Sequence, residues 1–164
     1  MTSDQFAKLK PPAIISTVAS LPRRFGETFV PAPNADPDEV AALVAADGRS
    51  MLDYVAEATA LVKSIGEAIN TTANHDGASV HADAIAESRS NPATASGSRE
   101  SELQGLEAAT DELVATMKGF SAHQWGRTAG VDGGGSVSLE QLGQQVARSA
   151  ISQLSAAQAL ASTF

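Results

Sequence analysis

The chain has 164 residues, of which 43% are apolar and 4% aromatic, and its formal net charge at neutral pH is −8. A chain of this length can bury a core without disulfides or metals, so we expect a single domain spanning residues 1–164. The negative charge repels phosphate backbones, and no cluster of Lys and Arg interleaved with aromatics offsets it. Composition therefore argues against nucleic acid as a partner.

The sequence contains no cysteine, which excludes disulfides, thiolate metal ligands and a thiol nucleophile. Residues 1–10 lack the basic start of a secretion signal, and the apolar stretch 14–21 is too short to cross a bilayer. We therefore expect a cytoplasmic protein with no membrane partner.

Apolar residues at helical spacing predict the first amphipathic helix. They lie three and four positions apart and follow two prolines: Ile14, Val18, Leu21, Phe25 and Phe29. Pro22 interrupts this run, because proline removes one backbone hydrogen bond and crowds the preceding turn. The sequence therefore predicts a kink at this point or a fresh helix capped by Ser20.

A short helix and a long one follow. Asp36 suits the N-cap of the short helix and Pro37 its first position, and we expect that helix to end near Gly48. Ser50 is placed to cap the long helix. The long helix has the clearest apolar stripe of the chain: Met51, Val55, Ala58, Val62, Ile65 and Ile69. This stripe predicts a helix that ends at about residue 70.

Residues 71–98 are rich in Ala, Ser, Asn, Gly and His, include Pro92, and have no sustained apolar period. This composition predicts a long irregular connection that contains at most a brief helix over residues 80–88. Such long connections between packed helices are uncommon, and they are either functional or mobile. We expect a mobile one.

Two further long helices complete the pattern. The first follows Ser98 and carries the stripe Leu103, Leu106, Thr110, Leu113, Met117 and Phe120. The second follows a capping box of Ser138 and Gln141, and its stripe is Leu142, Val146, Ala150, Leu154, Ala157 and Ala161. The glycines at 133–135 indicate a flexible turn, because neither a strand nor a lysine accompanies them as in a phosphate-binding loop. With no strand pairs evident, the sequence predicts an all-α, up-and-down four-helix bundle.

Two segments resemble the DinB-like superfamily, which includes metal-dependent, thiol-cofactor transferases and mycothiol-dependent maleylpyruvate isomerases. The first segment, residues 47–58, is similar to the family's Gly-x-Trp-Ser-Val opening and its Val-Val-x-His pattern, although Arg49 stands where Trp is usual. The second combines Trp125-Gly126-Arg127 with residues 137–142 at the start of the last helix. The resemblance implies a bundle in which side chains of two helices hold a divalent metal.

The resemblance places the family's metal ligands on Glu57 and, in the last helix, on Ser149 and Gln153, with Gln145 one turn earlier. Neutral Ser and Gln oxygens cannot replace imidazoles at a transition metal. We therefore expect neither a metal nor another cofactor. Two interpretations stay open: a hydrogen-bonded polar patch at the edge of the core, which we favour, and a relic cleft for a small polar ligand.

Two other groups of residues are candidates for a metal site or an anion site. His75 and His81, with Asp76 and Asp83 nearby, match no known metal-ligand spacing. Trp125 either anchors its loop on the core, which we favour, or covers one mouth of the bundle. In the second case, Arg127 would attract a carboxylate or phosphate group.

The leading interpretation is a DinB-like protein without the family's metal centre, which binds a small ligand or self-associates. The alternative is a thiol-cofactor (mycothiol-type) transferase or isomerase with a divergent active site, so whether the chain is an enzyme stays open. The last helix carries more alanines than one packing seam needs: Ala150, Ala156, Ala157, Ala159 and Ala161. This surplus favours a homodimer.

Overall fold

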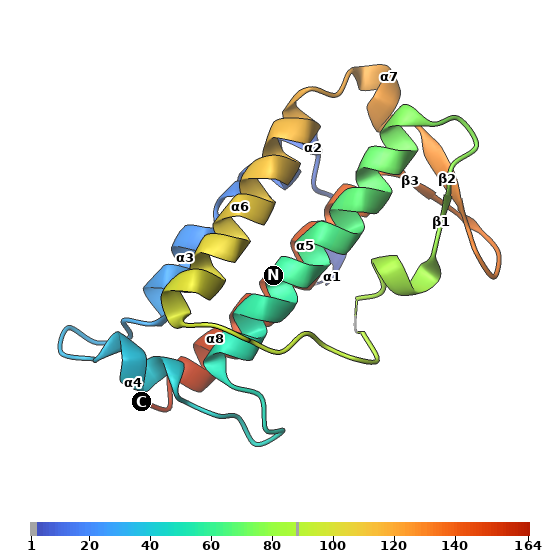
Figure 1. Cartoon of the computed structure of the whole chain (residues 1–164). Coiled ribbons are helices and arrows are strands. Elements are labelled where there is room, and N and C mark those ends of the chain that lie inside the picture. Colours follow the sequence, from blue (N-terminus) through green and yellow to red (C-terminus); the bar gives the residue numbers. More distant parts are fainter. Residues whose placement is uncertain (1–2, 88) are drawn as a thin grey trace.

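A bundle of long helices forms the body of the molecule in the computed structural model, which describes residues 3–87 and 89–164 (Figure 1). Its long elements are α2 (Pro11–Ala19) with α3 (Leu21–Thr28), α5 (Met51–Asn74), α6 (Arg99–Lys118) and α8 (Leu139–Ala161). Short helices flank them: α1 (Ser3–Phe6), α4 (Pro37–Ala41), the 3₁₀ helix η1 (Ala82–Ile85) and α7 (Ala122–Trp125). The mostly helical four-helix bundle expected from the sequence is confirmed.

Three long helices, α5, α6 and α8, begin where the sequence predicts, because a serine side chain caps each of them. Ser50 accepts the N–H of Asp53 at 3.2 Å, and the Asp53 carboxylate accepts the N–H of Ser50 at 2.7 Å. Ser98 caps α6 by accepting a backbone N–H at 3.3 Å. The predicted capping box of Ser138 and Gln141 starts α8, with bonds of 2.8 and 3.1 Å.

The chain breaks between α2 and α3, as Pro22 predicts, but Ser20 does not cap the second piece. Its hydroxyl donates instead to the carbonyl of Thr17 at 2.7 Å, and its backbone is helical. The two pieces therefore act as one kinked arm of the bundle.

Two helix ends differ from the prediction. α5 continues to Asn74 because Thr72 and Ala73 remain fully buried against the core. α4 ends at Ala41 rather than near Gly48, because Val44 pairs with Ser50 in an isolated antiparallel bridge. The backbone groups after α4 are thus satisfied by a tight reversal instead of helical bonds.

The helix directions do not alternate, so the predicted up-and-down order is wrong. α5 and α6 run the same way, because Gly66 lies against Leu113, and both residues follow their helix starts by similar distances. α8 runs opposite to α5, since Arg49 before α5 bonds Gln153 late in α8. Residues 75–87 and 89–98 lead from the end of α5 back to the start of α6, and η1 lies on the side of α5 that faces away from α6 (Figure 1). An extended chain covers ~3.3 Å per residue against ~1.5 Å in a helix, which makes this return possible.

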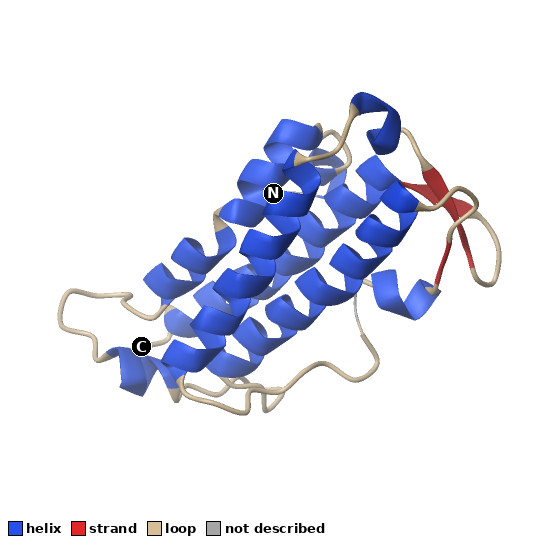
Figure 2. Cartoon of the chain, turned by 45° about the horizontal axis from the view of Figure 1, so that its top comes forward, coloured by secondary structure: helices blue, strands red, loops and turns tan. Residues whose placement is uncertain are grey.

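A small sheet at one end of the bundle contradicts the prediction of no strand pairs (Figure 2). β2 (Thr128–Val131) pairs in parallel with β1 (Ser79–Val80) and antiparallel with β3 (Ser136–Ser138). Gly133, Gly134 and Gly135 turn the hairpin with φ of 88°, 113° and 90°, a region that favours glycine. Strands this short leave no recognisable alternation, and all-α is therefore only an approximate description.

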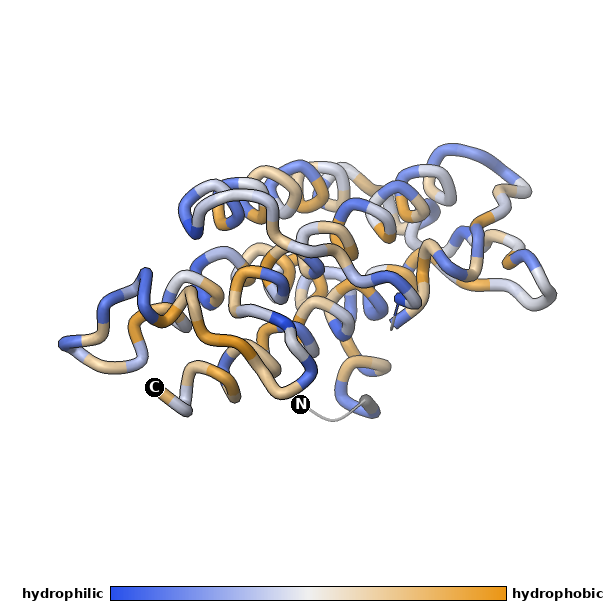
Figure 3. The backbone as a smooth tube through the Cα atoms, turned by 60° about the horizontal axis from the view of Figure 1, so that its bottom comes forward, coloured by the Kyte–Doolittle hydropathy of each residue, from blue (hydrophilic) through white to orange (hydrophobic). Residues whose placement is uncertain are grey.

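One cluster of buried apolar side chains joins the helices of the bundle. Hydrophobic and hydrophilic positions alternate along the helices, as Figure 3 shows. Ala150, Ala157 and Ala161 are buried within this cluster, and Ala159 is the exposed member of the alanine set. Most of the supposed surplus on α8 is therefore used inside the chain. Within residues 3–87 and 89–164, no helix has the length and apolar character needed to span a bilayer.

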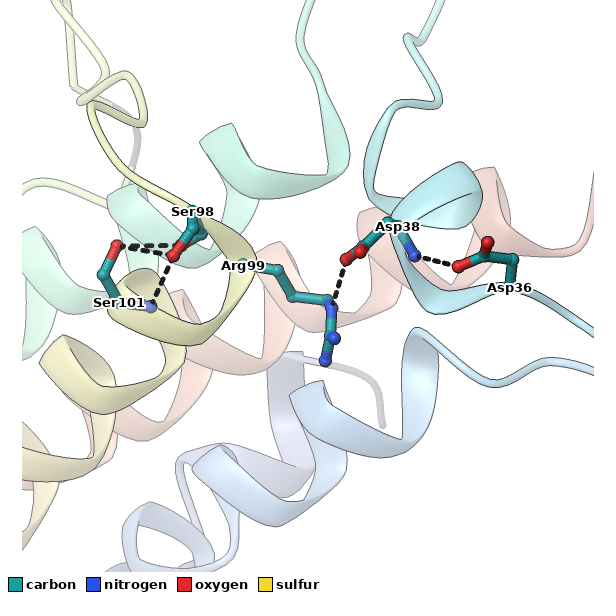
Figure 4. Close-up of polar contacts among 5 residues, drawn as sticks. All are labelled: Asp36, Asp38, Ser98, Arg99 and Ser101. Atoms are coloured by element: carbon teal, nitrogen blue, oxygen red, sulfur yellow. Dashed lines mark hydrogen bonds and ion pairs between the residues drawn. The ribbon is translucent and has the colours of Figure 1, made fainter.

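The short helix α4 is fixed to the start of α6 (Figure 4). Asp36 caps α4 by accepting the N–H of Asp38 at 2.9 Å. Arg99, in the first turn of α6, donates from Nε to Asp38 Oδ1 at 3.1 Å. This contact ties the loop before α5 to the end of the returning chain.

Candidate functional site

Glu57 lies on the buried face of α5 with 2% of its surface exposed. Its carboxylate faces residues 89–98, which we call the returning segment. Oε2 accepts the N–H of Ala93 at 2.5 Å, and Oε1 lies 3.8 Å from Arg89 Nε. The buried charge is thus matched by one backbone donor and one cation, as such a group requires.

Asp53 lies one helical turn before Glu57 and holds the same segment. Its Oδ1 accepts the N–H of Ala95 at 2.8 Å. Burial alone raises the pKa of Asp53, but hydrogen bonds from the backbone of Ser50 and Ala95, together with Arg49, lower it below the usual value. Asp53 and Glu57 thus fix the returning segment along α5.

Gln145 and Ser149 form a polar row on α8 that ends at Arg148. Gln145 Nε2 donates to the buried Ser149 Oγ at 3.3 Å, and Arg148 Nη2 donates to Gln145 Oε1. Arg148 Nε is buried, has no hydrogen-bond partner in the part of the chain that the structure describes, and lies 3.6 Å from Glu87 Oε1. A guanidinium Nε–H without an acceptor is a strong donor left unused.

Gln153 belongs to a third cluster, around Arg49. Arg49 Nη2 donates to Gln153 Oε1 at 3.1 Å, and the guanidinium lies 4.3 Å from the centre of the Tyr54 ring. Burial, and secondarily the charge of Asp47, raises the pKa of Tyr54. Arg49 therefore joins the start of α5 to the end of α8, at the position where the family usually has Trp.

The four residues that the resemblance assigns to the metal are divided among three separate sets of contacts. Within residues 3–87 and 89–164, no hydrogen bond or ion pair joins Glu57 to Gln145, Ser149 or Gln153. In that same part of the chain, no three His, Cys, Asp or Glu side chains form a metal-binding group. The donors present do not fit the family's metal, since the carboxylate is already engaged and the others are neutral.

A pocket of about 300 Å³ lies beside the Arg148 row, between α1, η1, β3 and the first half of α8. Gln141, Gln144, Gln145 and Arg148 provide its polar side. Its apolar side consists of Phe6, Ile85, Val137 and Leu142. An apolar wall with a few convergent polar groups is the usual form of a small-molecule site, and this volume lies at the small end of the range.

Trp125 and Arg127 occupy different surroundings. Trp125 packs against the core, with its ring edge-on to Phe120 at 5.6 Å between centroids. Arg127 Nη1 donates to the carbonyl of Ala73 at the end of α5, and its buried Nε has no hydrogen-bond partner among the described residues. Trp125 thus anchors the loop and positions Arg127 beyond the bundle core.

The loop histidines are also separated. His81 Nδ1 lies 2.8 Å from Asp132 Oδ2, and Asp132 Oδ1 accepts the N–H of Ala82 at 2.5 Å. The hydrogen bond from His81, followed by that from Ala82, lowers the pKa of Asp132. This exposed contact holds the connection to the β-hairpin. His75 instead lines a hollow with Asp76.

Arg148, Arg89 and Glu87 were not among the residues singled out from the sequence. The signal for Arg148 was its place three residues after Gln145, since this spacing puts both on one helical face. Arg89 and Glu87 lie in the irregular connection, where no periodicity relates them to a helix face.

Neither family models nor curated proteins give a match to this chain. Among solved structures, it is similar to YfiT from Bacillus subtilis, described as a probable metal-dependent hydrolase with an unusual four-helix bundle topology. The TM-score is 0.63 at 12% sequence identity, over 93% of this chain and 87% of the other. Identity this low carries the fold and not the chemistry. This likeness shows that the chain has the fold of that protein, in agreement with the four-helix bundle that the resemblance of its sequence motifs implied.

Proposed function

We propose that the chain is a metal-independent binding protein of the DinB-like fold, whose ligand is a small molecule with an anionic head and an apolar body. The site is the pocket between α1, η1, β3 and α8. The observation that carries the proposal is Arg148, which lines this pocket and whose buried Nε–H has no hydrogen-bond acceptor among residues 3–87 and 89–164. A ligand carboxylate would satisfy that donor while its body covers Phe6 and Ile85.

Glu87 supports the choice of an anionic head. Its carboxylate lies 3.6 Å from Arg148 Nε, beyond hydrogen-bond distance, and the Glu87 side chain is about half exposed. It therefore neutralises the guanidinium only loosely and can yield to a better-placed anion. Gln145, which accepts from Arg148, keeps the guanidinium directed along α8.

Calorimetric titration with hexanoate and its neutral amide, hexanamide, tests the proposal. We expect saturable binding of hexanoate and none of hexanamide. Arg148→Gln should weaken binding more than about tenfold, because a hydrogen bond to a charged group contributes ~1.5–3 kcal/mol. Glu87→Gln should strengthen binding, since it removes the competing carboxylate.

Arg23→Gln is the matched control, because Arg23 is an exposed arginine paired with Glu27 one turn away on α3. It changes the net charge as Arg148→Gln does and should leave hexanoate binding unchanged. Equal binding of hexanamide, or full binding by Arg148→Gln, would contradict the proposal. Metal analysis of untagged protein tests whether the chain is metal-independent. A stoichiometric transition metal that is lost in Glu57→Ala would refute metal independence.

A thiol-cofactor transferase or isomerase is the second candidate, favoured by the structural likeness to a probable metal-dependent hydrolase. It predicts that mycothiol-like thiols raise the melting temperature, because a ligand of the native state stabilises it by mass action. The same screen run with hexanoate separates the two candidates.

Self-association as a homodimer and a cytoplasmic location complete the proposal. The dimer now depends on surface other than Ala150, Ala157 and Ala161, which the core uses. Light scattering at working concentrations tests it, and a monomeric mass would remove this part of the proposal.

A further inference from the structure

A second hollow lies at the end of the molecule where α5 ends and α7 and β2 begin. Four side chains with ionisable or charged groups line it: His75, Asp76, His123 and Arg127. None of them lines the pocket beside Arg148. The chain as a whole carries a net charge of −8, so a gathering of one guanidinium and two imidazoles around a single carboxylate is unusual for it.

Arg127 is held in place at this hollow. Its Nη1 donates to the carbonyl of Ala73, which also accepts from Gln124 Nε2 at 3.4 Å. These bonds satisfy a carbonyl at the end of α5, where cations are favoured. They do not use Arg127 Nε, which is buried and lacks a hydrogen-bond partner within residues 3–87 and 89–164. The guanidinium of Arg127 is therefore held in place, while its Nε–H has no acceptor among the described residues.

The carboxylate of Asp76 lies on the side from which an acceptor could reach the Nε–H of Arg127. Its Oδ1 lies 3.7 Å from Arg127 Nε, too far for a hydrogen bond, and 91% of its side chain is exposed. An exposed carboxylate at this distance contributes little and is free to move aside. An oxyanion with more acceptor oxygens can approach the guanidinium more closely and also reach the imidazoles of His75 and His123.

We infer that this hollow binds the phosphoryl group of a small phosphorylated molecule through Arg127, His75 and His123, with Asp76 as the group it displaces. A phosphoryl group suits the site because it presents three acceptor oxygens, and three of the side chains that line the hollow can donate hydrogen bonds. A transition-metal ion does not suit it, since no three His, Cys, Asp or Glu side chains within residues 3–87 and 89–164 form a metal-binding group.

The test is an NMR titration of the full chain with glycerol phosphate, which follows the Arg127 Nε–H and the imidazole resonances of His75 and His123. We expect saturable shifts of all three. His123→Gln, which leaves the Ala73 carbonyl capped, should weaken binding about tenfold, the effect of losing one hydrogen bond to a charged group. Asp76→Asn should strengthen binding.

Arg127→Gln should abolish saturable binding, and Arg127→Lys, which retains a charge near α5, controls for loss of the helix end. Arg23→Gln is the matched surface control and should bind as the wild type does. Shifts that stay linear with concentration and are equal in Arg127→Gln would overturn the inference. Saturation by malonate without a response to glycerol phosphate, or by Zn²⁺ alone, would overturn it as well.

Discussion

Glu57 and Arg148 lie on facing helices, and each is a charged side chain in contact with the connection between α5 and α6, but they differ in how fully they are satisfied. Glu57 is 2% exposed and accepts a backbone N–H at 2.5 Å with a cation nearby. Arg148 is about a third exposed, and its buried Nε–H has no acceptor in the described part of the chain. The position to which the sequence resemblance assigned a metal ligand is thus a structural contact, and the donor that lacks an acceptor among the described residues is Arg148 Nε.

Glu57→Ala tests the structural side of this comparison and should have the largest effect. It leaves the Ala93 N–H and the Arg89 guanidinium without their acceptor, so the free energy of unfolding should fall by ~1–3 kcal/mol. Urea unfolding measures the loss, and faster hydrogen exchange at Ala93 should accompany it. The control Glu107→Ala, at an exposed position of α6, should stay within ~0.5 kcal/mol of the wild type. An equally small effect in both variants would refute a structural role for Glu57.

Ser50→Ala sharpens the same side of the comparison, because Asp53 both caps α5 and holds Ala95. Loss of the Ser50 hydroxyl removes one half of the capping box and should cost about 1 kcal/mol of unfolding free energy. Thermal or urea unfolding measures it. Ser138→Ala, which removes the matching half of the box on α8, is the control and should cost a similar amount. A much larger loss in Ser50→Ala would show that the returning segment depends on this cap.

The acid dependence of stability reports on Asp53 directly. Its pKa in the folded state is lowered, so the stability it contributes is fully present above the unfolded value of about 3.9 and is lost as pH falls through the folded pKa. Asp53→Asn should therefore flatten the fall in unfolding free energy below about pH 4. Urea unfolding at a series of pH values measures this slope. An unchanged slope in Asp53→Asn would contradict the assignment.

Helix starts could be predicted from the sequence because they are local. Ser50 and Ser138 each bond a residue three positions away, so a stretch of four residues is enough to predict each cap. Helix direction is not local: the parallel arrangement of α5 and α6 depends on the contact of Gly66 with Leu113. The sheet was missed for the same reason, since β1 and β2 pair across a long stretch of chain.

The candidate site was predictable only as a set of polar positions. The helical period correctly indicates that Gln145 and Ser149 share a face, and they do bond each other. The helical period says nothing about the returning segment, in which the N–H of Ala93 donates to the carboxylate of Glu57. The resemblance therefore named polar positions on α5 and α8, while the partners of Glu57 came from an aperiodic connection.

Arg148→Gln tests the other side of the comparison and should have the smallest effect on stability. The ion pair with Glu87 spans 3.6 Å between side chains that are 32% and 48% exposed. Such solvent-screened pairs contribute ~0–1 kcal/mol, so urea unfolding of this variant should lie close to that of the wild type. The same variant should lose carboxylate binding, which Glu57→Ala should retain as long as it folds. A stability loss in Arg148→Gln as large as in Glu57→Ala would break the comparison, because Arg148 would then be a second structural contact rather than a free donor.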